Sequence, residues 1–249
     1  MIYLFYMQWH IGCSGFHYKD WRGKFYPEKL AMKNWFDYYC EHFRTLELNV
    51  TFYRFPQLKF LQNWHQKAPA AFRFSVKAPK AITHFKQFHD TARMINDFYE
   101  TINDGLQEKL GPVLFQVPPR FSYNEERLER ITKSFDPSFN NVAEFRHISW
   151  WRDDVYKTLA ENKITFCGQS HPLLPDDVIV NTTSVYYRFH GVPDLYRSPY
   201  TSEFLQRVID DVKAHSDTKE GWFYFNNDYD AVGVENAKTM ITIAKQNSI

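Results

Sequence analysis

The stretch Tyr187-Arg188-Phe189-His190-Gly191 joins an alternation of aromatic residues to a charged end and a glycine. Side chains alternate between the two faces of a strand, so one face would be aromatic and the other would carry Arg188 and His190. A short apolar run, a polar cluster and a helical segment follow one another eight times in the chain. The other seven runs are His10-Ile11-Gly12-Cys13-Ser14, Leu46-Glu47-Leu48-Asn49, Phe74-Ser75-Val76-Lys77, Leu114-Phe115-Gln116, Glu144-Phe145-Arg146, Phe166-Cys167-Gly168-Gln169 and Phe225-Asn226-Asn227-Asp228. Eight strands alternating with helices predict a (β/α)8 barrel, whose active sites form at the carboxyl ends of the strands.

The composition fits one such barrel. A chain of 249 residues has the usual length, and we predict a single domain over residues 1–249. Aromatic residues make up 18% of the chain, which favours a large packed core. The formal net charge of +1 gives no general attraction to nucleic acid, and no apolar stretch is long enough for a membrane span. Cys13, Cys40 and Cys167 are too scattered for a disulfide framework, so we expect reduced thiols and a cytoplasmic protein.

Helical spacing of apolar residues is legible between the runs. It predicts helices over residues 33–43, 56–68, 89–109, 124–135, 150–162, 203–215 and 231–246. Ser149 is expected to cap the fifth of these helices, and Thr201 or Ser202 the sixth. The segment 171–183 contains two prolines, so the helix after the sixth strand is expected to be irregular or missing.

Strand parity predicts what the barrel encloses. If the bulky apolar residues face the helices, the residues of opposite parity point inward. The inward set is Ser14, Glu47, Asn49, Lys77, Gln116, Glu144, Arg146, Gln169, Arg188, His190, Asn226 and Asp228. Three carboxylates and three fixed cations would then share one layer, as a structural network or as a ligand site. We favour a site, because a buried ionic network adds little stability over an apolar core.

Two features suggest what such a site would bind. Arg188, with Asn226 and Asn227 after the eighth strand, suits an anion, because barrel enzymes often bind phosphate after strands seven and eight. Phe52 and Tyr53 belong to loops at the same mouth, where aromatic rings would stack a sugar or a base or would pack on the rim.

Lys77 and the carboxylates allow more than one chemistry. Lys77 is expected to be the electrostatic partner of Glu47, and the alternative is a Schiff-base lysine whose pKa is lowered by arginine neighbours. Glu47, Glu144, His190 and Asp228 could converge on a metal, but the cations in the same mouth disfavour one. We therefore predict no metal ligands.

Long motifs resemble the DUF72 (YecE-like) family across nearly the whole chain. They lie at residues 12–23 (GCSGFHYKDWRG), 47–54 (ELNVTFYR), 74–79 (FSVKAP), 116–119 (QVPP), 144–147 (EFRH), 187–191 (YRFHG) and 224–228 (YFNND). The resemblance implies a (β/α)8 barrel and supplies no function. It also implies an acid after the sixth strand, where this chain has Gln169, so Asp176 or Asp177 is a possible substitute.

The sequence thus predicts a metal-independent enzyme without a cofactor, acting on a small anionic, phosphorylated or sugar-like substrate. It would be an acid–base hydrolase, lyase or isomerase. The predicted catalytic residues are Glu47, Glu144, His190 and Lys77. The predicted substrate-binding residues are Ser14, Asn49, Tyr53, Gln116, Arg146, Arg188, Asn226, Asn227 and Asp228. The alternatives are a non-catalytic protein that binds a metabolite or a nucleic-acid end, and a divalent-metal hydrolase.

Overall fold

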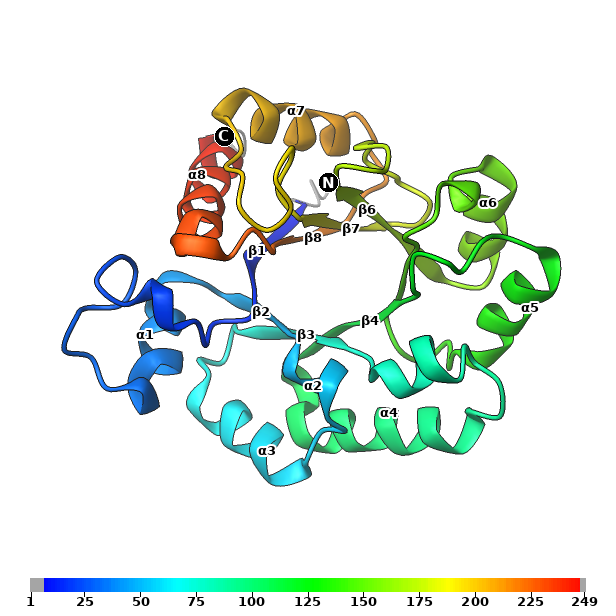
Figure 1. The fold of residues 1–249 in the computed structure, drawn as a ribbon, viewed down its shortest axis with the longest axis horizontal. Helices are drawn as coiled ribbons and strands as arrows, with labels where there is room; N and C mark the ends of the chain where they lie inside the picture. Colours follow the sequence, from blue (N-terminus) through cyan, green and yellow to red (C-terminus); the bar gives the residue numbers. More distant parts are fainter. Residues whose placement is uncertain (1–6, 247–249) are drawn as a thin grey trace, which may run out of the picture.

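The strands of the computed structural model, which describes residues 7–246, close into a parallel barrel in sequence order (Figure 1). β8 pairs with β1, so the sheet has no open edge. The strands are β1 Gln8–Ser14, β2 Thr45–Leu48, β3 Arg73–Lys77, β4 Leu110–Gln116, β5 Asn141–Glu144, β6 Ile164–Ser170, β7 Ser184–Phe189 and β8 Glu220–Phe225. The predicted (β/α)8 barrel is confirmed for these residues. The ends of the predicted domain, residues 1–6 and 247–249, lie outside the described residues.

Helices surround the barrel in Figure 1. They are α1 Trp35–His42, α2 Val50–Tyr53, α3 Leu58–Lys67, α4 Ala92–Leu106, α5 Glu125–Ser134, α6 Asp153–Glu161, α7 Ser202–Lys213 and α8 Val232–Gln246. All but the short α2 coincide with predicted helices, with ends that differ by a few residues. Residues 171–183, between β6 and β7, contain no helix, as predicted. None of the helices within residues 7–246 has the length and apolar character needed to cross a membrane.

The predicted cap of α6 is wrong. Ser149 lies in a short turn before the helix, where its Oγ accepts a hydrogen bond of 2.8 Å from the backbone N–H of Tyr123. The reason is the neighbouring Trp150, which is fully buried and donates its indole N–H to the carbonyl oxygen of Phe121 at 2.7 Å. That anchor holds the turn against the core, so α6 begins only at Asp153. Thr201 does cap α7, as predicted.

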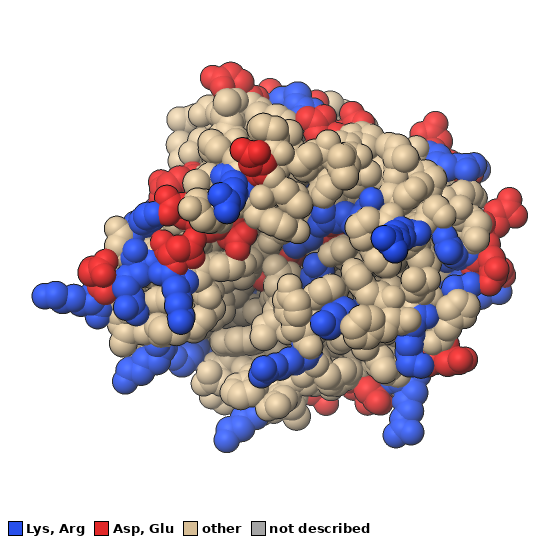
Figure 2. All heavy atoms as spheres, in the orientation of Figure 1, with Lys and Arg blue, Asp and Glu red and all other residues tan. Residues whose placement is uncertain are grey.

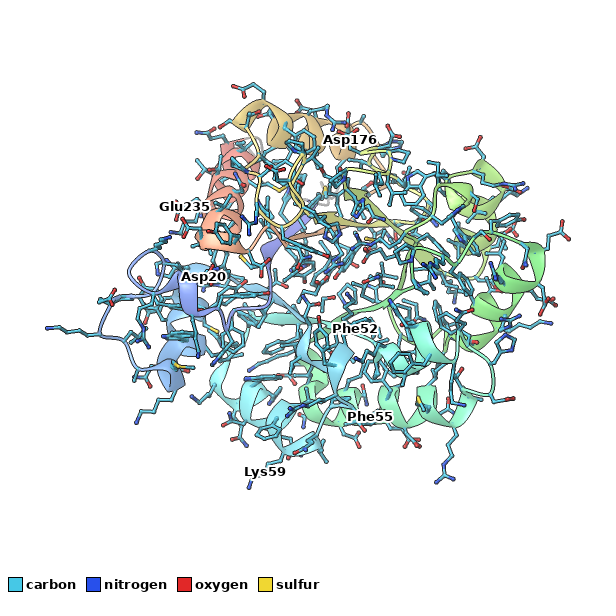
Figure 3. The ribbon with its side chains drawn as sticks, in the orientation of Figure 1. Asp20, Phe52, Phe55, Lys59, Asp176 and Glu235 are labelled. Atoms are coloured by element: carbon cyan, nitrogen blue, oxygen red, sulfur yellow. The ribbon has the colours of Figure 1, made fainter. Side chains whose placement is uncertain are left out.

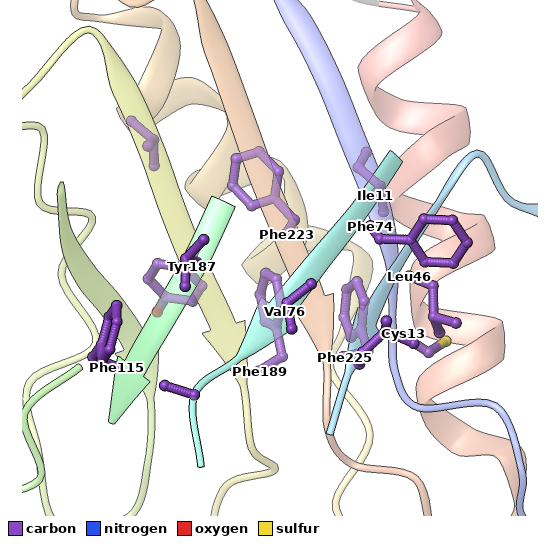
Figure 4. Close-up of a cluster of buried hydrophobic side chains, with 14 of the residues drawn as sticks. Ile11, Cys13, Leu46, Phe74, Val76, Phe115, Tyr187, Phe189, Phe223 and Phe225 are labelled. Carbon is purple, nitrogen blue, oxygen red and sulfur yellow. The ribbon is translucent and has the colours of Figure 1, made fainter. Parts of the chain in front are cut away.

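Apolar side chains of one parity fill the space between the strands and the helices. Phe189 and Phe225 are typical of this layer, with parallel rings whose centres lie 4.2 Å apart. Figure 4 shows part of the layer on its strands. A fully buried phenylalanine stabilises the fold by about 1.5–3 kcal/mol. Because this outer layer supplies the main core, the interior of the barrel can hold polar groups at one end.

A second apolar cluster fills the middle of the barrel interior. Its members are Leu114, Val142, Cys167, Tyr186, Trp222 and Tyr224. Tyr186 precedes Arg188 by two residues, and Val142 precedes Glu144 in the same way. Since side chains of equal parity share a face, the two charged side chains lie one layer nearer the carboxyl ends of the strands.

Candidate active site

Arg188 joins two carboxylates from different strands beneath the mouth of the barrel. Its Nη2 donates to Oε1 of Glu47 at 2.6 Å, and its Nη1 donates to Oε2 of Glu144 at 2.7 Å. All three side chains are at most 1% exposed. Charges so far from water must be paired. The structure thus brings together three residues for which parity predicted convergence.

Hydroxyl groups and a second guanidinium also contact the two carboxylates. Ser14 Oγ donates to Oε1 of Glu47 at 2.5 Å, and Tyr186 Oη donates to Oε2 at 2.5 Å. Nε of Arg146 lies 2.5 Å from Oε1 of Glu144. Both carboxylates therefore serve to hold cations and hydroxyls. Across residues 7–246, no group of three or more histidines, cysteines or acidic residues is placed to hold a metal ion.

This pairing argues against the acid–base role predicted for Glu144. Burial by itself raises the pKa of Glu144, but Arg146 and Arg188 outweigh it and hold that pKa well below its usual range. A carboxylate that stays ionised is a poor general acid. Each terminal nitrogen of Arg188 is bonded to a carboxylate, so its charge is already paired, and its role in anion binding stays a prediction. Its guanidinium links the carboxylates of Glu47 and Glu144 beneath the cavity.

His190 is fully buried and is bonded on both sides of its ring. Nη2 of Arg146 donates to Nε2 at 2.9 Å, and Nδ1 lies 3.0 Å from the side-chain amide of Asn226. Because an arginine can only donate, Nε2 accepts and the ring is neutral. Burial and the charge of Arg146 keep the pKa of His190 well below its usual value. A neutral ring held in this way argues against the predicted proton shuttle.

Lys77 is not paired with Glu47, which corrects the expected partnership. The carboxylate oxygens of Glu47 are already occupied, and Nζ of Lys77 instead donates to Oε1 of Gln116 at 2.6 Å. The same Nζ lies 4.4 Å from the centre of the Phe52 ring. Lys77 takes part in none of the ion pairs within residues 7–246. Burial and the nearby charge of Arg188 lower the pKa of Lys77 to about 7.

A cavity of about 640 Å³ opens above this network, at the carboxyl ends of the strands. It is lined by Tyr18, Asp20, Asn49, Phe52, Tyr53, Lys77, Gln116, Arg146, Arg188, Leu195, Tyr196, Arg197, Asn226, Asp228 and Tyr229. Figure 2 shows this face with charged side chains around and inside a central hollow. In Figure 3, Asp20 and Phe52 lie on different sides of the central opening. Charged groups and aromatic rings therefore share one opening.

The charges of the cavity are divided between its sides. Asp20 follows β1 and Asp228 follows β8, and these two strands are neighbours. Lys77 ends β3 and Arg146 follows β5, farther around the barrel. Burial raises the pKa of Asp228 above its usual value. A bound molecule would thus meet Asp20 and Asp228 on one side and Lys77 and Arg146 on another.

Arg197 lines the cavity, and sequence analysis missed it. The centre of its guanidinium lies 4.5 Å from the centre of the Tyr229 ring. Gly191 begins its loop with a φ of +88°, and a Cβ there would lie 2.9 Å from the carbonyl oxygen of Asp194. Glycine is therefore needed for the turn that presents Arg197. Its position in the sequence could have identified it, because Arg197 is the arginine of the loop after the seventh strand, where barrels often bind phosphate.

All but one of the predicted site residues either line the cavity or lie in the buried network beneath it. Those that line the cavity are Asn49, Tyr53, Lys77, Gln116, Arg146, Arg188, Asn226 and Asp228. Those in the buried network beneath it are Ser14, Glu47, Glu144 and His190. Asn227 is the exception, because its Nδ2 donates to the carbonyl oxygen of Ser198 and to Oδ1 of Asn236, both at 3.0 Å. It holds a loop and lies outside the cavity lining.

The structure does not place an acid from the loop after β6 in the cavity. Gln169 is fully buried and donates to the carbonyl oxygen of Phe145 at 2.8 Å. Asp176 pairs with Arg207 of α7 at 2.9 Å, and Figure 3 shows it beside that helix, away from the opening. Asp177 is also absent from the cavity lining. Neither aspartate replaces the acid expected at position 169.

Comparison with known proteins identifies a family, a relative and solved structures with the same fold. Residues 10–248 match the model of a family described as "Protein of unknown function DUF72". The UPF0759 protein YunF of Bacillus subtilis is 26% identical to this chain, with 94% of each covered. The crystal structure of a DUF72 family protein from Thermotoga maritima has a TM-score of 0.87 and 29% identity, covering 96% of this chain and 99% of that one. A DUF72 family protein from Enterococcus faecalis, at 21% identity and a TM-score of 0.81 over 96% of both chains, has the same fold.

Proposed function

Because the chain belongs to the DUF72 family, which is described as being of unknown function, we propose an activity from the chemistry of the mouth itself. We propose a metal-independent enzyme that acts on a small molecule with an anionic group at one end and hydroxyl groups at the other, such as a sugar phosphate or a sugar acid. We place it in the cytoplasm, because Cys13, Cys40 and Cys167 are all free, buried thiols.

Two unpaired cations carry the proposal. Lys77 and Arg197 both line the cavity, and neither belongs to an ion pair among the described residues. An anionic group bound at Arg197 would gain a charged donor without breaking an existing ion pair. Arg146 adds a third cation, held in place by Glu144.

The acidic and aromatic residues of the cavity lining suit a sugar with hydroxyl groups. The carboxylates of Asp20 and Asp228 are hydrogen-bond acceptors, and an ionised carboxylate offers no donor of its own. Tyr53 and Tyr229 are exposed rings on the lining, at 68% and 52% exposure, and they offer apolar faces to a sugar ring. A sugar-like molecule with one anionic substituent matches both kinds of group in the lining.

Lys77 and Asp228 are the best candidates for proton transfer. The pKa of Lys77 is lowered to about 7, and the pKa of Asp228 is raised by burial. Both shifts move the groups towards neutral pH, where proton transfer to and from a substrate is most efficient. In this proposal, Glu47 and Glu144 position Arg188 and Arg146 and do not act as acid and base.

Binding of inorganic phosphate, measured by calorimetry at pH 7 and low ionic strength, tests the anion site. Arg197→Met should weaken binding by about 10–100-fold, the effect of losing a hydrogen bond to a charged group. Arg93→Met is the matched control, because Arg93 is an arginine of α4 whose side chain is 95% exposed and lies outside the cavity lining. Absence of phosphate binding to the unaltered protein would reject the anion site. Turnover of sugar phosphates or sugar acids would then distinguish an enzyme from a binding protein.

A further inference from the structure

The amine of Lys77 is presented to the cavity in an unusual way for a buried lysine. Only 8% of the residue is exposed, yet its nitrogen has a neutral amide oxygen as its hydrogen-bond acceptor and no carboxylate partner. Lys109 provides the contrast within the same chain. It is equally buried, but its Nζ donates to the carbonyl oxygens of His65 and Ala68 at 2.6 and 2.7 Å, outside the cavity. Lys109 therefore supports the fold, whereas Lys77 faces a space that a ligand can enter.

We propose that Lys77 is a nucleophile that forms an imine with the carbonyl carbon of the substrate, which narrows the substrate to small aldehydes or ketones bearing a phosphate or carboxylate. This inference rests on the proposed function, because the same cavity must first bind the anionic group. The anion would be bound by Arg197 and Arg146, which leaves the amine free for the covalent step.

The neighbours of Lys77 favour its neutral, nucleophilic form. Arg188 and Arg146 carry permanent positive charge, and their own carboxylate partners are directed at them and not at the amine. Burial and the charge of Arg188 together bring the pKa of Lys77 to about 7, so about half of the amine is neutral at pH 7. An unperturbed lysine, with a pKa of about 10.4, is neutral in fewer than about one molecule in a thousand at that pH.

The covalent step balances without a metal or a redox partner. The lone pair of the neutral amine adds to the carbonyl carbon, and a proton moves from nitrogen to the former carbonyl oxygen to give a carbinolamine. The C–O bond then breaks, and the oxygen leaves as water with the second amine proton, so one imine and one water form from one amine and one carbonyl. Asp228 lines the same cavity and is the acid available to protonate the departing oxygen. Protonated at nitrogen, the imine draws electrons from a neighbouring bond, as a lyase or an isomerase requires.

Reduction with sodium borohydride tests the imine directly. The full-length protein is incubated at pH 7 with pyruvate or with dihydroxyacetone phosphate, reduced, and examined by intact mass and peptide mapping. Reduction converts the imine to a stable amine, so pyruvate should add the mass of pyruvic acid less one oxygen atom. We expect the adduct on Lys77, with labelling at least ~100-fold faster than an unperturbed lysine would give.

Lys77→Met and Lys80→Met form the matched pair of variants, since Lys80 lies three residues further along at the same mouth. Lys77→Met should lose the adduct, and Lys80→Met should keep it. Lys77→Arg keeps a positive charge but cannot form an imine, so it checks that loss of labelling is not loss of fold. Adducts spread over surface lysines, or retained in Lys77→Met, would overturn the inference. Absence of adduct with both probes, in a protein that still binds phosphate, would reject the imine and leave the anion site standing.

Discussion

Arg188 of β7 and Glu144 of β5 form a hydrogen bond of 2.7 Å across the barrel interior, although β6 separates their strands. The other terminal nitrogen of the same guanidinium reaches Glu47 of β2. One side chain thus links three strands that do not pair with one another, at the level where the cavity begins. A buried link of this kind defines the position of each partner, because none can move without leaving a charge unpaired.

Arg188→Met should therefore destabilise the protein strongly. Glu47 would retain only the hydroxyl groups of Ser14 and Tyr186 as partners, while Glu144 would keep Arg146. Loss of one partner of a buried ion pair costs about 3–5 kcal/mol, and we expect that loss in the free energy of unfolding measured with urea.

Two further variants show whether the unpaired charge is the cause. Glu47→Gln added to Arg188→Met removes the stranded carboxylate and should recover much of the loss. Lys133→Met breaks an exposed pair with Glu129 on α5 and should leave stability unchanged. A cost for Arg188→Met no larger than that for Lys133→Met would contradict the buried network.

Lys77 should make stability depend on pH above neutrality. Its pKa is about 7 in the folded protein and about 10.4 when unfolded, so between these values the unfolded chain binds more protons. Stability supplied by this group is lowest below pH 7, where the folded protein must bury the ammonium near Arg188 and Arg146, and rises towards pH 10. The variant Lys77→Met lacks this pH-dependent contribution to stability. We expect the free energy of unfolding of the unaltered protein to rise relative to Lys77→Met by up to ~1.4 kcal/mol per pH unit between pH 7 and 9.

Urea unfolding of both proteins at pH 6, 7, 8 and 9 measures this difference. Other titrating groups are common to both proteins, so they cancel in the comparison. A difference that stays constant, or one that shifts towards Lys77→Met as the pH rises, would show that the amine is charged in the folded protein at neutral pH.

Parity along the strands was sufficient to predict which residues face inward, because side chains alternate with a fixed period of two. It correctly grouped Glu47, Glu144 and Arg188, which come from three separate strands. Parity does not say how far a side chain reaches or which cation meets which acid. Lys77 was expected to pair with Glu47, but the guanidinium of Arg188 occupies that carboxylate from the other side of the barrel.

Loops limited the prediction more than strands did. Arg197 reaches the cavity only because its loop turns back at Gly191, and no periodic pattern describes such a turn. Asn227 shows the opposite error. It follows β8 immediately beside Asn226, yet its side chain points to the backbone of Ser198 and not to the cavity.

Asn227→Ala should separate stability from ligand binding. The change removes hydrogen bonds to Ser198 and Asn236 within buried surroundings, which costs about 1–3 kcal/mol in unfolding. Because Asn227 does not line the cavity, the affinity for phosphate in the folded variant should equal that of the unaltered protein. Arg197→Met should show the reverse, with stability retained and affinity reduced. Calorimetric titration measures the affinity, and urea unfolding measures the stability. If Asn227→Ala lost affinity for phosphate while Arg197→Met did not, Asn227 would belong to the binding site.

Gln116→Glu should suppress imine formation by Lys77 without touching the lysine. The side-chain oxygen of Gln116 is 2.6 Å from Nζ, so the substitution places a carboxylate beside the amine. An opposite charge at that distance favours the ammonium and raises the pKa of Lys77 from about 7 towards its usual value. At pH 7 the neutral fraction falls, and borohydride trapping of pyruvate should slow by about tenfold for each unit of that rise.

The pH profile of the trapping rate distinguishes this effect from damage to the cavity. In Gln116→Glu the rate should recover as the pH rises, because deprotonation restores the nucleophile, and its midpoint should lie above that of the unaltered protein. Gln116→Leu is the matched control, since it removes the hydrogen bond of 2.6 Å without adding charge and so gives no reason for the midpoint to rise. Equal midpoints in Gln116→Glu and the unaltered protein would mean that the labelled amine is not the one beside Gln116. A slow rate in Gln116→Glu at every pH would instead indicate that the carboxylate blocks entry to the cavity.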